Sequence, residues 1–506
     1  MRTDTLRKTL HCLAGLLAGL ATTSLRSAEK ASDSAAGAAP NYLELVRAYA
    51  DTMIAHGRDD YGPQKSPLFA ATLNRQTLRI PDKPPGGIPG VRVQDRTLWG
   101  ANPMHDQNLY QVLYGLSEVT GVPKYAAEAD KALKWFFENC QSPVTGLMAW
   151  GEHIGWDFRR EGVEEGHTIH EFFRPWVLWK KTFELAPKPA QRFALGVWNH
   201  QISNQQTGVF SRHAAYARHA PGKGHEFPRH GGFYMATWAE AYQFTRDPEM
   251  LRAIETLLGY FDRSANKHTG AIPSQGAIPD LFWPMSALGY AIDLGNSAPL
   301  VPAALGDAMR RSAAKVDSVF LRMKHDLSPG GKGFIKNAHS STLEAGDVRV
   351  QLMKTTKPAW YPYTYTWLSA YGMPTDANLA MFCLLRYDQT RNDGYKQLIV
   401  ASARRYLDSL PDTSIALYPT AMAEAIANLL AAYRLTGDKA FNDRAEVLGR
   451  ESVRIFFDGS PLPRASSQHT HYEAITGGDT LVMQLLDLWA AQNTAAKKPR
   501  LVWTNR

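Results

Sequence analysis

The feature of this sequence that most constrains its fold is a short motif that occurs four times. In each copy an apolar, helically periodic segment ends in a threonine, a polar turn follows, and a bulky residue stands five positions after the threonine. Each copy is typical of a tight link between two antiparallel helices, so the chain is predicted to be an array of helical hairpins. The four copies are Thr120-Gly-Val-Pro-Lys-Tyr125, Thr245-Arg-Asp-Pro-Glu-Met250, Thr390-Arg-Asn-Asp-Gly-Tyr395 and Thr436-Gly-Asp-Lys-Ala-Phe441.

The segments that flank these links carry apolar residues at helical spacing. Met422, Ile426 and Leu429 are three and four positions apart and therefore share one helix face. Pro123 and Pro248 stand where a second helix would begin, a position that tolerates proline. The helices predicted on these grounds span residues 42–56, 106–119, 123–140, 168–185, 189–202, 232–244, 248–264, 284–294, 302–326, 376–388, 393–409, 419–435, 439–456 and 480–492.

About fourteen helices make about seven hairpins if the last helix pairs with the first. The closed form of such an array is an all-α (α/α) toroid, predicted here as a single domain over residues 41–506. Links inside hairpins are short, whereas those between hairpins are long. Because long links in a compact fold are usually functional, we expect these loops to gather at one end of the ring and to carry the site. The long links span residues 141–167, 203–231, 267–283 and 328–373.

The first residues are typical of a secretory signal peptide. Arg2, Arg7 and Lys8 precede an apolar stretch at 9–21, which is too short to span a bilayer. The sequence predicts a signal peptide over residues 1–28 and an Ala/Ser-rich linker over 29–40. No later run reaches about 18 apolar residues, so we expect an exported protein, periplasmic or secreted, without membrane insertion after signal removal.

Composition limits the class of partner. The charge of +8 comes without a clustered basic run, so a nucleic-acid partner is not expected. Thirteen Trp and 21 Tyr suit flat polar ligands such as sugars. Cys140 and Cys383 are predicted to be buried thiols, because two distant cysteines make neither a disulfide framework nor a CxxC zinc site. The sequence carries no signal for an oligomeric state.

Three residues in or beside the long links are candidate metal ligands: His153, Glu171 and His213. Two neutral imidazoles and one carboxylate suit a borderline divalent ion such as Mn or Zn and leave coordination positions for substrate oxygens. The spacing forms no compact motif. From the residues alone, the alternative that each side chain is satisfied by local hydrogen bonds stays open.

Several segments, taken in order between residues 42 and 216, resemble the periplasmic pectate lyases of polysaccharide lyase family two. The resemblance implies a seven-hairpin (α/α) barrel in which His153, Glu171 and His213 hold a catalytic divalent cation. Manganese is the expected ion, and another transition metal or calcium is the alternative. It also implies that Arg212 is the catalytic base. The segments that carry the resemblance are Tyr49-Ala-Asp, Asp60-Tyr-Gly-Pro-Gln-Lys-Ser-Pro-Leu, Gln107-Asn-Leu, Leu116-Ser-Glu-Val-Thr-Gly, Gly146-Leu-Met-Ala-Trp-Gly-Glu-His, Ile169-His-Glu and Ser211-Arg-His.

β-Elimination next to a uronic acid requires neutralisation of the carboxylate and removal of the proton on the adjacent carbon. A bound cation serves the first need. Arginine is an awkward base for the second, because free guanidinium deprotonates only above about pH 12. Arg212 is therefore alternatively a clamp for the substrate carboxylate, in which case Tyr216, His170 or His230 is the base.

Aromatic and basic residues of the long links are candidate substrate-binding residues. The aromatic side chains would stack on sugar rings, with core packing as the alternative. The lysines would pair with uronate carboxylates, with a solvated loop charge as the alternative. Arg229, which precedes a predicted helix in Arg229-His230-Gly-Gly, would hold an anion at the helix N-terminus, with a simple turn as the alternative. The full set is Trp150, Trp156, Arg229, Lys354, Lys357, Trp360, Tyr361 and Tyr363.

Together these features predict an exported, metal-assisted polysaccharide lyase that acts on an acidic, uronate-containing polysaccharide or oligosaccharide, pectate or oligogalacturonate. Alginate and glucuronan lyases of related (α/α) barrel families remain alternatives. A second alternative is a glycoside hydrolase that uses two carboxylates such as Asp157 and Asp280. A third is a non-catalytic glycan-binding protein.

Overall fold

The computed structural model describes residues 40–222, 226–368 and 373–506. Its contacts separate the chain into two compact units, Met1–Asn41 and Tyr42–Arg506. The predicted signal peptide, residues 1–28, and all but the last residue of the predicted linker, 29–40, lie outside the described residues. No helix among the described residues combines the length and the apolar character needed to cross a membrane.

Helices dominate the unit Tyr42–Arg506. The α-helices are α2 (Tyr42–His56), α3 (Gln107–Thr120), α4 (Lys124–Asn139), α5 (Trp179–Leu185), α6 (Pro187–His200), α7 (Pro228–Thr245), α8 (Pro248–Ser264), α9 (Pro284–Ser297), α10 (Ala303–Arg322), α11 (Val348–Met353), α12 (Asp376–Thr390), α13 (Asp393–Arg404), α14 (Pro419–Thr436), α15 (Lys439–Phe456) and α16 (Gly478–Gln492). Single-turn 3-10 helices lie at Val93–Asp95, Ala298–Leu300, Pro358–Trp360 and Ala474–Thr476.

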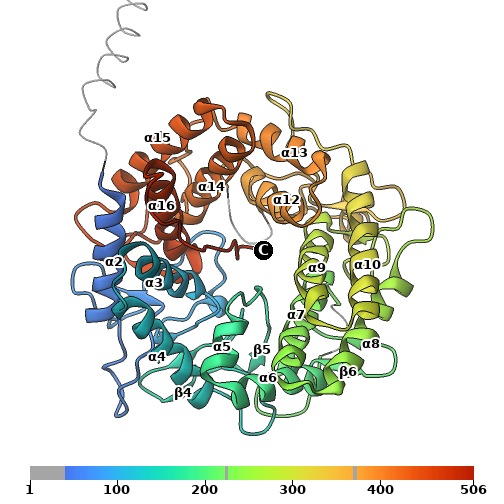
Figure 1. Cartoon of the computed structure of the whole chain (residues 1–506), viewed down its shortest axis with the longest axis horizontal. Helices are drawn as coiled ribbons and strands as arrows, with labels where there is room; N and C mark the ends of the chain where they lie inside the picture. Colours follow the sequence, from blue (N-terminus) through green and yellow to red (C-terminus); the bar gives the residue numbers. More distant parts are fainter. Residues whose placement is uncertain (1–39, 223–225, 369–372) are drawn as a thin grey trace, which may run out of the picture. The chain divides into compact units, whose positions relative to one another are not determined.

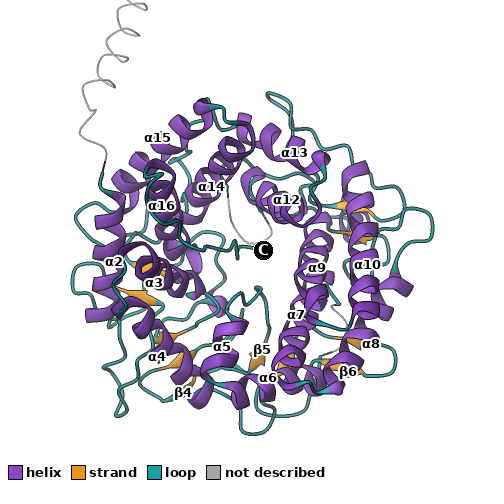
Figure 2. Cartoon of the chain, in the orientation of Figure 1, coloured by secondary structure: helices purple, strands orange, loops and turns teal. Residues whose placement is uncertain are grey.

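The strands among the described residues are two or three residues long and form five small sheets (Figure 2). They pair in the orders β1–β11, β10–β9, β2–β3–β4, β5–β8 and β6–β7. Their bounds are β1 (Thr72–Leu73), β2 (Gly100–Ala101), β3 (Trp156–Asp157), β4 (Gly162–Val163), β5 (Ile169–His170), β6 (Ile202–Asn204), β7 (Val209–Phe210), β8 (Ala214–Ala215), β9 (Leu281–Phe282), β10 (Ala338–His339) and β11 (Tyr472–Glu473).

Within the unit Tyr42–Arg506, the helices form a closed ring of seven hairpins (Figure 1). The hairpins are α3–α4, α5–α6, α7–α8, α9–α10, α12–α13, α14–α15 and α16–α2, the last of which joins the two ends of the array. At six of the seven junctions one helix of a hairpin packs against its counterpart in the next, as α7 does on α9 and α14 on α16; between the hairpins α3–α4 and α5–α6 the contact is from α4 to α5. The predicted all-α toroid, including the pairing of the last helix with the first, is confirmed.

The four threonines of the repeated motif close their helices in the same way. The Oγ1 atoms of Thr120, Thr245, Thr390 and Thr436 each donate a hydrogen bond to the carbonyl four residues earlier, at 2.6–2.7 Å. Each Oγ1 also accepts the backbone N–H two residues later, at 3.2–3.3 Å. One hydroxyl therefore adds a second hydrogen bond to a carbonyl of the last turn and pairs the backbone N–H just beyond the helix end, which explains why threonine recurs there.

The predicted helix 168–185 is wrong in its first eleven residues. Ile169 and His170 form β5, which pairs with β8, and only Trp179–Leu185 is helical. Two physical reasons account for the difference: Pro175 disfavours helical backbone at the residue before it, and strand pairing with a distant segment satisfies the backbone instead. Conversely, α7 begins four residues earlier than predicted, so Arg229 and His230 lie in its first turn.

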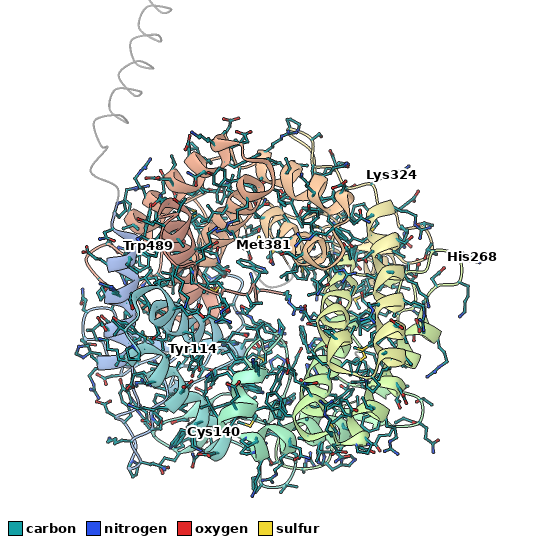
Figure 3. All side chains as sticks on the ribbon, in the orientation of Figure 1. Tyr114, Cys140, His268, Lys324, Met381 and Trp489 are labelled. Atoms are coloured by element: carbon teal, nitrogen blue, oxygen red, sulfur yellow. The ribbon has the colours of Figure 1, made fainter. Side chains whose placement is uncertain are left out.

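Most of the core of the unit is one large cluster of buried apolar side chains, and a second cluster, with Leu288, Phe320 and Phe382, packs between α9, α10 and α12. Met381, on the inner helix α12, is buried, whereas His268 and Lys324 are exposed (Figure 3). Cys140 and Cys383 are both buried free thiols, as predicted. The packed layers leave the long links as the part of this unit where polar side chains converge.

Candidate active site

The pairing of β5 with β8 brings two of the metal-ligand candidates together. Ile169 lies opposite Ala215 and His170 opposite Ala214, so the same antiparallel register places Glu171 opposite His213. Directly opposed residues of an antiparallel pair project to the same face. Successive residues of a strand alternate between faces, so His170 points the other way, into the core.

A glycine brings His153 to the same place. Gly151 has φ +128°, and a Cβ there would lie 2.1 Å from the carbonyl oxygen of Glu171. Only a residue without a side chain allows the two backbones to approach so closely. The backbone N–H of Glu152 then donates to the Glu171 carbonyl at 3.3 Å, which carries His153 next to Glu171.

Glu171 is the centre of the cluster and is fully buried. Its Oε2 lies 2.8 Å from Nε2 of His213 and 3.3 Å from Nε2 of His153. Its Oε1 lies 3.0 Å from Nε2 of His230 and also binds the guanidinium of Arg212. Burial raises the pKa of Glu171, but hydrogen bonds from the three histidines outweigh it and hold that pKa well below the usual range.

A second layer of charged groups surrounds His153. Oδ1 of Asp95 lies 2.9 Å from Nδ1 of His153, which leaves Nε2 of the same ring directed at Glu171. Arg92 binds Oδ2 of Asp95 and Oε1 of Glu152, both at 2.6 Å. Burial and the neighbouring charge of Glu171 raise the pKa of Glu152 to about 8.

The donor set fits a divalent cation. One ligand atom each from His153, Glu171 and His213 lies within 4.8 Å of the others. Two imidazole nitrogens and a carboxylate oxygen are a set that manganese, zinc and related ions accept. Asp95 supplies the partner that fixes the ring of a ligating histidine, a common arrangement around protein-bound metals. Asp95, Glu152 and His153 form a second, overlapping group of candidate ligands.

Arg212 lies between this cluster and the main cavity. Its Nη1 contacts Glu171 and lies 3.2 Å from Oε2 of Glu152. The guanidinium carbon sits 4.9 Å from the ring centroid of Phe227. A group held by two carboxylates and an aromatic face has a defined orientation, and Arg212 lines the cavity in that orientation.

The main cavity has a volume of about 570 Å³ and is strongly basic. Its described lining includes six basic side chains, whereas Asp95 and Glu152, beside the metal-ligand cluster, are the acidic ones. Five aromatic side chains also line it, a composition suited to the ring faces and carboxylates of an acidic sugar. The basic residues are Arg174, Arg212, Arg229, Lys336, Arg349 and Lys357; the aromatic residues are Phe173, Phe227, Trp283, Trp360 and Tyr418.

Of the eight predicted substrate-binding residues, Arg229, Lys357 and Trp360 line this cavity. Trp150 does not: it is fully buried in an aromatic cluster whose stacking partner is Phe172, so the core alternative is correct for it.

The other four also lie outside the described lining of the cavity. Trp156, in β3, packs edge-on against Trp135. Lys354 is exposed at the end of α11, where the solvated-charge alternative applies. Tyr361 and Tyr363 contact each other at a centroid distance of 5.9 Å.

The alternative bases are placed less favourably than Arg212. Tyr216 directs its hydroxyl toward the carbonyl of Cys140, and His170 is buried with Nδ1 2.6 Å from Oε1 of Gln201. His230 contacts Glu171 but is itself fully buried, and burial lowers its pKa to about 3. Among the described residues that line the cavity, none of these three appears.

The hydrolase alternative loses its proposed carboxylate pair. Asp157 accepts the backbone N–H groups of Arg159 and Arg160 at 2.8 and 3.1 Å, and so stabilises a turn. Asp280 binds Nδ1 of His339 at 2.8 Å. Neither carboxylate belongs to the described lining of the main cavity.

Sequence reasoning missed half of the six basic side chains that line the cavity, and one of its tryptophans. Arg174 lies in the wrongly predicted helix, Lys336 and Arg349 lie in a long link without a motif, and Trp283 directly precedes a helix. Glu152 alone carried a signal, because it adjoins the candidate ligand His153.

Comparison with known proteins finds a family that matches the part of the chain that contains this cluster. Residues 91–245 match the periplasmic pectate lyase family. The matched region contains all three candidate metal ligands and Arg212, and it confirms the resemblance inferred from the motifs. A pectate disaccharide-lyase from Dickeya dadantii (strain 3937) is 25% identical over 162 residues, which are 30% of this chain and 30% of the relative. The alignment thus spans less than a third of the pectate lyase.

Solved structures with similar arrangements are distant in sequence. D-mannose isomerase is 10% identical over 90% of this chain and 97% of its own, with a TM-score of 0.48. Cellobiose 2-epimerase from Bacillus thermoamylovorans B4167 is 11% identical over 88% and 98%, with a TM-score of 0.46. An unsaturated glucuronyl hydrolase specific for heparin is 12% identical over 90% and 98%, with a TM-score of 0.45.

Proposed function

We propose that this protein is an exported polysaccharide lyase that cleaves a uronate-containing polymer, pectate or oligogalacturonate, by metal-assisted β-elimination. The observation that carries the proposal is the position of the cluster of His153, Glu171 and His213. Arg212 bridges that cluster to a cavity with a basic and aromatic lining. The match of the same residues to the periplasmic pectate lyase family supports the reaction class and the location.

A cation held by His153, Glu171 and His213 supplies positive charge that neutralises the substrate carboxylate and acidifies the proton on the adjacent carbon. Elimination then removes that proton, forms a carbon–carbon double bond and expels the glycosidic oxygen, which takes a proton from water. The lining arginines and lysines bind further carboxylates along the chain. The guanidinium carbon of Arg349 lies 5.1 Å from the ring centroid of Trp283 and 5.0 Å from that of Trp360, and the two tryptophans add aromatic surface for sugar rings to the cavity lining.

Arg212 is the residue proposed to act on the reacting sugar. As a base it acts in its neutral, deprotonated form: a guanidine nitrogen takes the proton from the carbon beside the carboxylate, and the side chain becomes guanidinium. As a clamp it holds the uronate carboxylate, and a different group takes the proton. The ion pairs with Glu171 and Glu152 favour the charged guanidinium and so support the clamp, whereas the family resemblance supports the base.

The test is the ultraviolet absorbance of polygalacturonate, alginate and glucuronan incubated with purified protein, first in manganese and then in chelator. β-Elimination creates an unsaturated uronate that absorbs in the ultraviolet, and hydrolysis does not. We expect a manganese-dependent rise on polygalacturonate that chelator abolishes. A rise on alginate or glucuronan would reassign the substrate. New reducing ends without absorbance would replace the lyase by a hydrolase, and binding without either signal would leave a glycan-binding protein.

A further inference from the structure

The residues that follow α16 and its turn, 500–506, run into the inner side of the ring within the unit Tyr42–Arg506 (Figure 1, where C marks the chain end). This inner segment, residues 500–506, contains no helix or strand, yet Trp503 and Thr504 are buried. Its backbone and side chains bond to four different inner helices. Contacts with helices from different parts of the ring therefore hold this segment in place.

The first two anchors are on α3 and α12. The backbone N–H of Val502 donates to Gln111 at 2.8 Å, and the hydroxyl of Thr504 donates to Asn108 at 2.9 Å. The indole N–H of Trp503 donates to Oδ1 of Asn378 on α12 at 3.2 Å. These contacts fix the middle of the segment.

The last two anchors are on α14 and α9. Nδ2 of Asn505 donates to Oε1 of Glu424 and to Oγ1 of Thr420, the latter at 3.3 Å. Arg506 forms a buried ion pair with Asp293 on α9 at 2.6 Å. The position of Asn505 is therefore determined by both of its chain neighbours, because Thr504 is bonded to α3 and Arg506 is bonded to α9.

Asn505 also lines the main cavity, together with Thr420, Arg212 and Arg229. The orientation of its amide follows from its partner, because the buried carboxylate of Glu424 requires a donor there and takes the NH2 group. In the part of the chain that the structure describes, no donor reaches the remaining carbonyl oxygen, Oδ1. A fixed hydrogen-bond acceptor is thus left at the cavity wall.

We propose that Asn505 is a substrate-binding residue whose side-chain carbonyl accepts a hydrogen bond from a sugar hydroxyl, so that the inner segment forms part of the substrate site. This inference rests on the proposed function, since it takes an acidic sugar as the ligand. The six basic side chains of the cavity attract carboxylates. A neutral acceptor repels a carboxylate and accepts from a hydroxyl, so Asn505 selects which edge of the sugar faces α14.

The experiment measures KM and kcat for oligogalacturonate by ultraviolet absorbance in manganese, and the Kd of trigalacturonate by calorimetry in chelator. For Asn505→Ala we expect KM and Kd to rise about three- to ten-fold, the loss typical of one hydrogen bond, with kcat within about two-fold of wild type. Asn493→Ala is the matched control: it removes the side-chain hydrogen bond of an exposed asparagine, from Nδ2 to the carbonyl of Trp489 at 2.8 Å, and because Asn493 lies outside the described lining of the cavity, KM stays unchanged.

Unchanged KM and Kd in Asn505→Ala would overturn the proposal, as would a fall in kcat and Tm without a change in KM, which is the mark of a structural role. If Asn505→Ala does not fold, Asn505→Gln keeps the amide and shifts its carbonyl by one methylene; the same rise in KM is then expected, and its absence contradicts the proposal.

The wild-type protein distinguishes failure of this inference from failure of the proposed function. If wild type binds trigalacturonate without turnover, the proposed function fails while Kd still tests Asn505. If it does not bind, both fail.

Discussion

At the scale of single residues, the candidate site depends on side chains whose partners hold them in one orientation. Arg212 is oriented by two carboxylates, and Asp95 holds His153 through Nδ1 so that Nε2 faces Glu171. Neither Arg212 nor Asp95 is part of the triad of His153, Glu171 and His213. Substitutions at these two positions therefore test how the orientation of the site contributes to turnover, through Arg212, and to cation binding, through Asp95.

Arg212→Lys distinguishes the base from the clamp. Lysine keeps the positive charge but loses the planar fork, so it clamps a carboxylate in part, and its single nitrogen does not reach the position of the guanidine nitrogen that would take the proton. If Arg212 is the base, kcat falls at least about 100-fold while manganese binding, measured by calorimetry, is unchanged. Activity above about a tenth of wild type would exclude the role of base and favour the clamp.

Asp95→Asn tests the support of a metal ligand. Loss of the carboxylate partner of a ligating histidine typically lowers metal affinity about 10- to 100-fold, because the ring is less well oriented and less basic. We expect a rise of that size in the Kd for manganese, measured by calorimetry. Asp157→Asn serves as control, since Asp157 stabilises a turn and does not contact His153. Equal manganese affinity in Asp95→Asn and wild type would show that Asp95 has no part in the site.

At the scale of elements, three of the hairpins are held by side chains at both ends of their short link. Thr245 closes α7 through its hydroxyl, and Asp247 caps α8 by accepting the backbone N–H of Glu249 at 3.0 Å. The same pairing of a closing threonine with a capping residue recurs at Thr390 and Thr436. Where the link itself pairs the backbone groups at a helix end, those hydrogen bonds do not depend on contacts with the next hairpin.

Asp247→Ala measures the contribution of one such cap. We expect the free energy of unfolding, from urea denaturation, to fall by about 1 kcal/mol, because a backbone donor at the start of α8 loses its acceptor. Glu255→Ala, at an exposed position of the same helix, is expected to stay within about 0.5 kcal/mol of wild type. If Asp247→Ala and Glu255→Ala have equal free energies of unfolding, the cap adds nothing to the stability that the packing of α8 already provides.

At the scale of the whole molecule, the closed ring buries acidic groups where its two ends meet. Asp479 stands in the first turn of α16, fully buried, and accepts the backbone N–H of Asn108 on α3 at 3.2 Å. Burial raises the pKa of Asp479 from 3.8 to about 6. Closing the ring therefore places a carboxyl group in surroundings that favour its neutral form.

Asp479→Asn tests this effect through pH. A raised folded pKa means that the folded state binds the proton more tightly, so the cost of ionising Asp479 is absent below about pH 4 and complete above about pH 6. The variant should gain about 3 kcal/mol over wild type between pH 4 and pH 7, from about two pKa units. Urea denaturation at both values measures it. Asp487→Asn, on the same helix and paired with Arg434, is the control; a gain that does not depend on pH would contradict the prediction.

The sequence by itself determined the seven-hairpin ring and the three candidate metal ligands. The ring followed because helical periodicity and the closing threonines are local, and their partners lie within a few residues. The ligand set followed from a resemblance over contiguous motifs, which the family match over residues 91–245 confirms as a likeness.

Only the tertiary structure decided what surrounds those ligands. Residues 169 and 170 form a strand because they pair with 214 and 215, more than forty positions away, and that pairing overrides the local helical pattern. The basic lining of the cavity joins Arg174, which precedes α5, to Lys336 and Arg349 of a link more than 150 residues later, and Asn505 reaches the cavity through contacts with helices far away in the sequence. Such positions are set by the packing of distant segments, so no local pattern marks them.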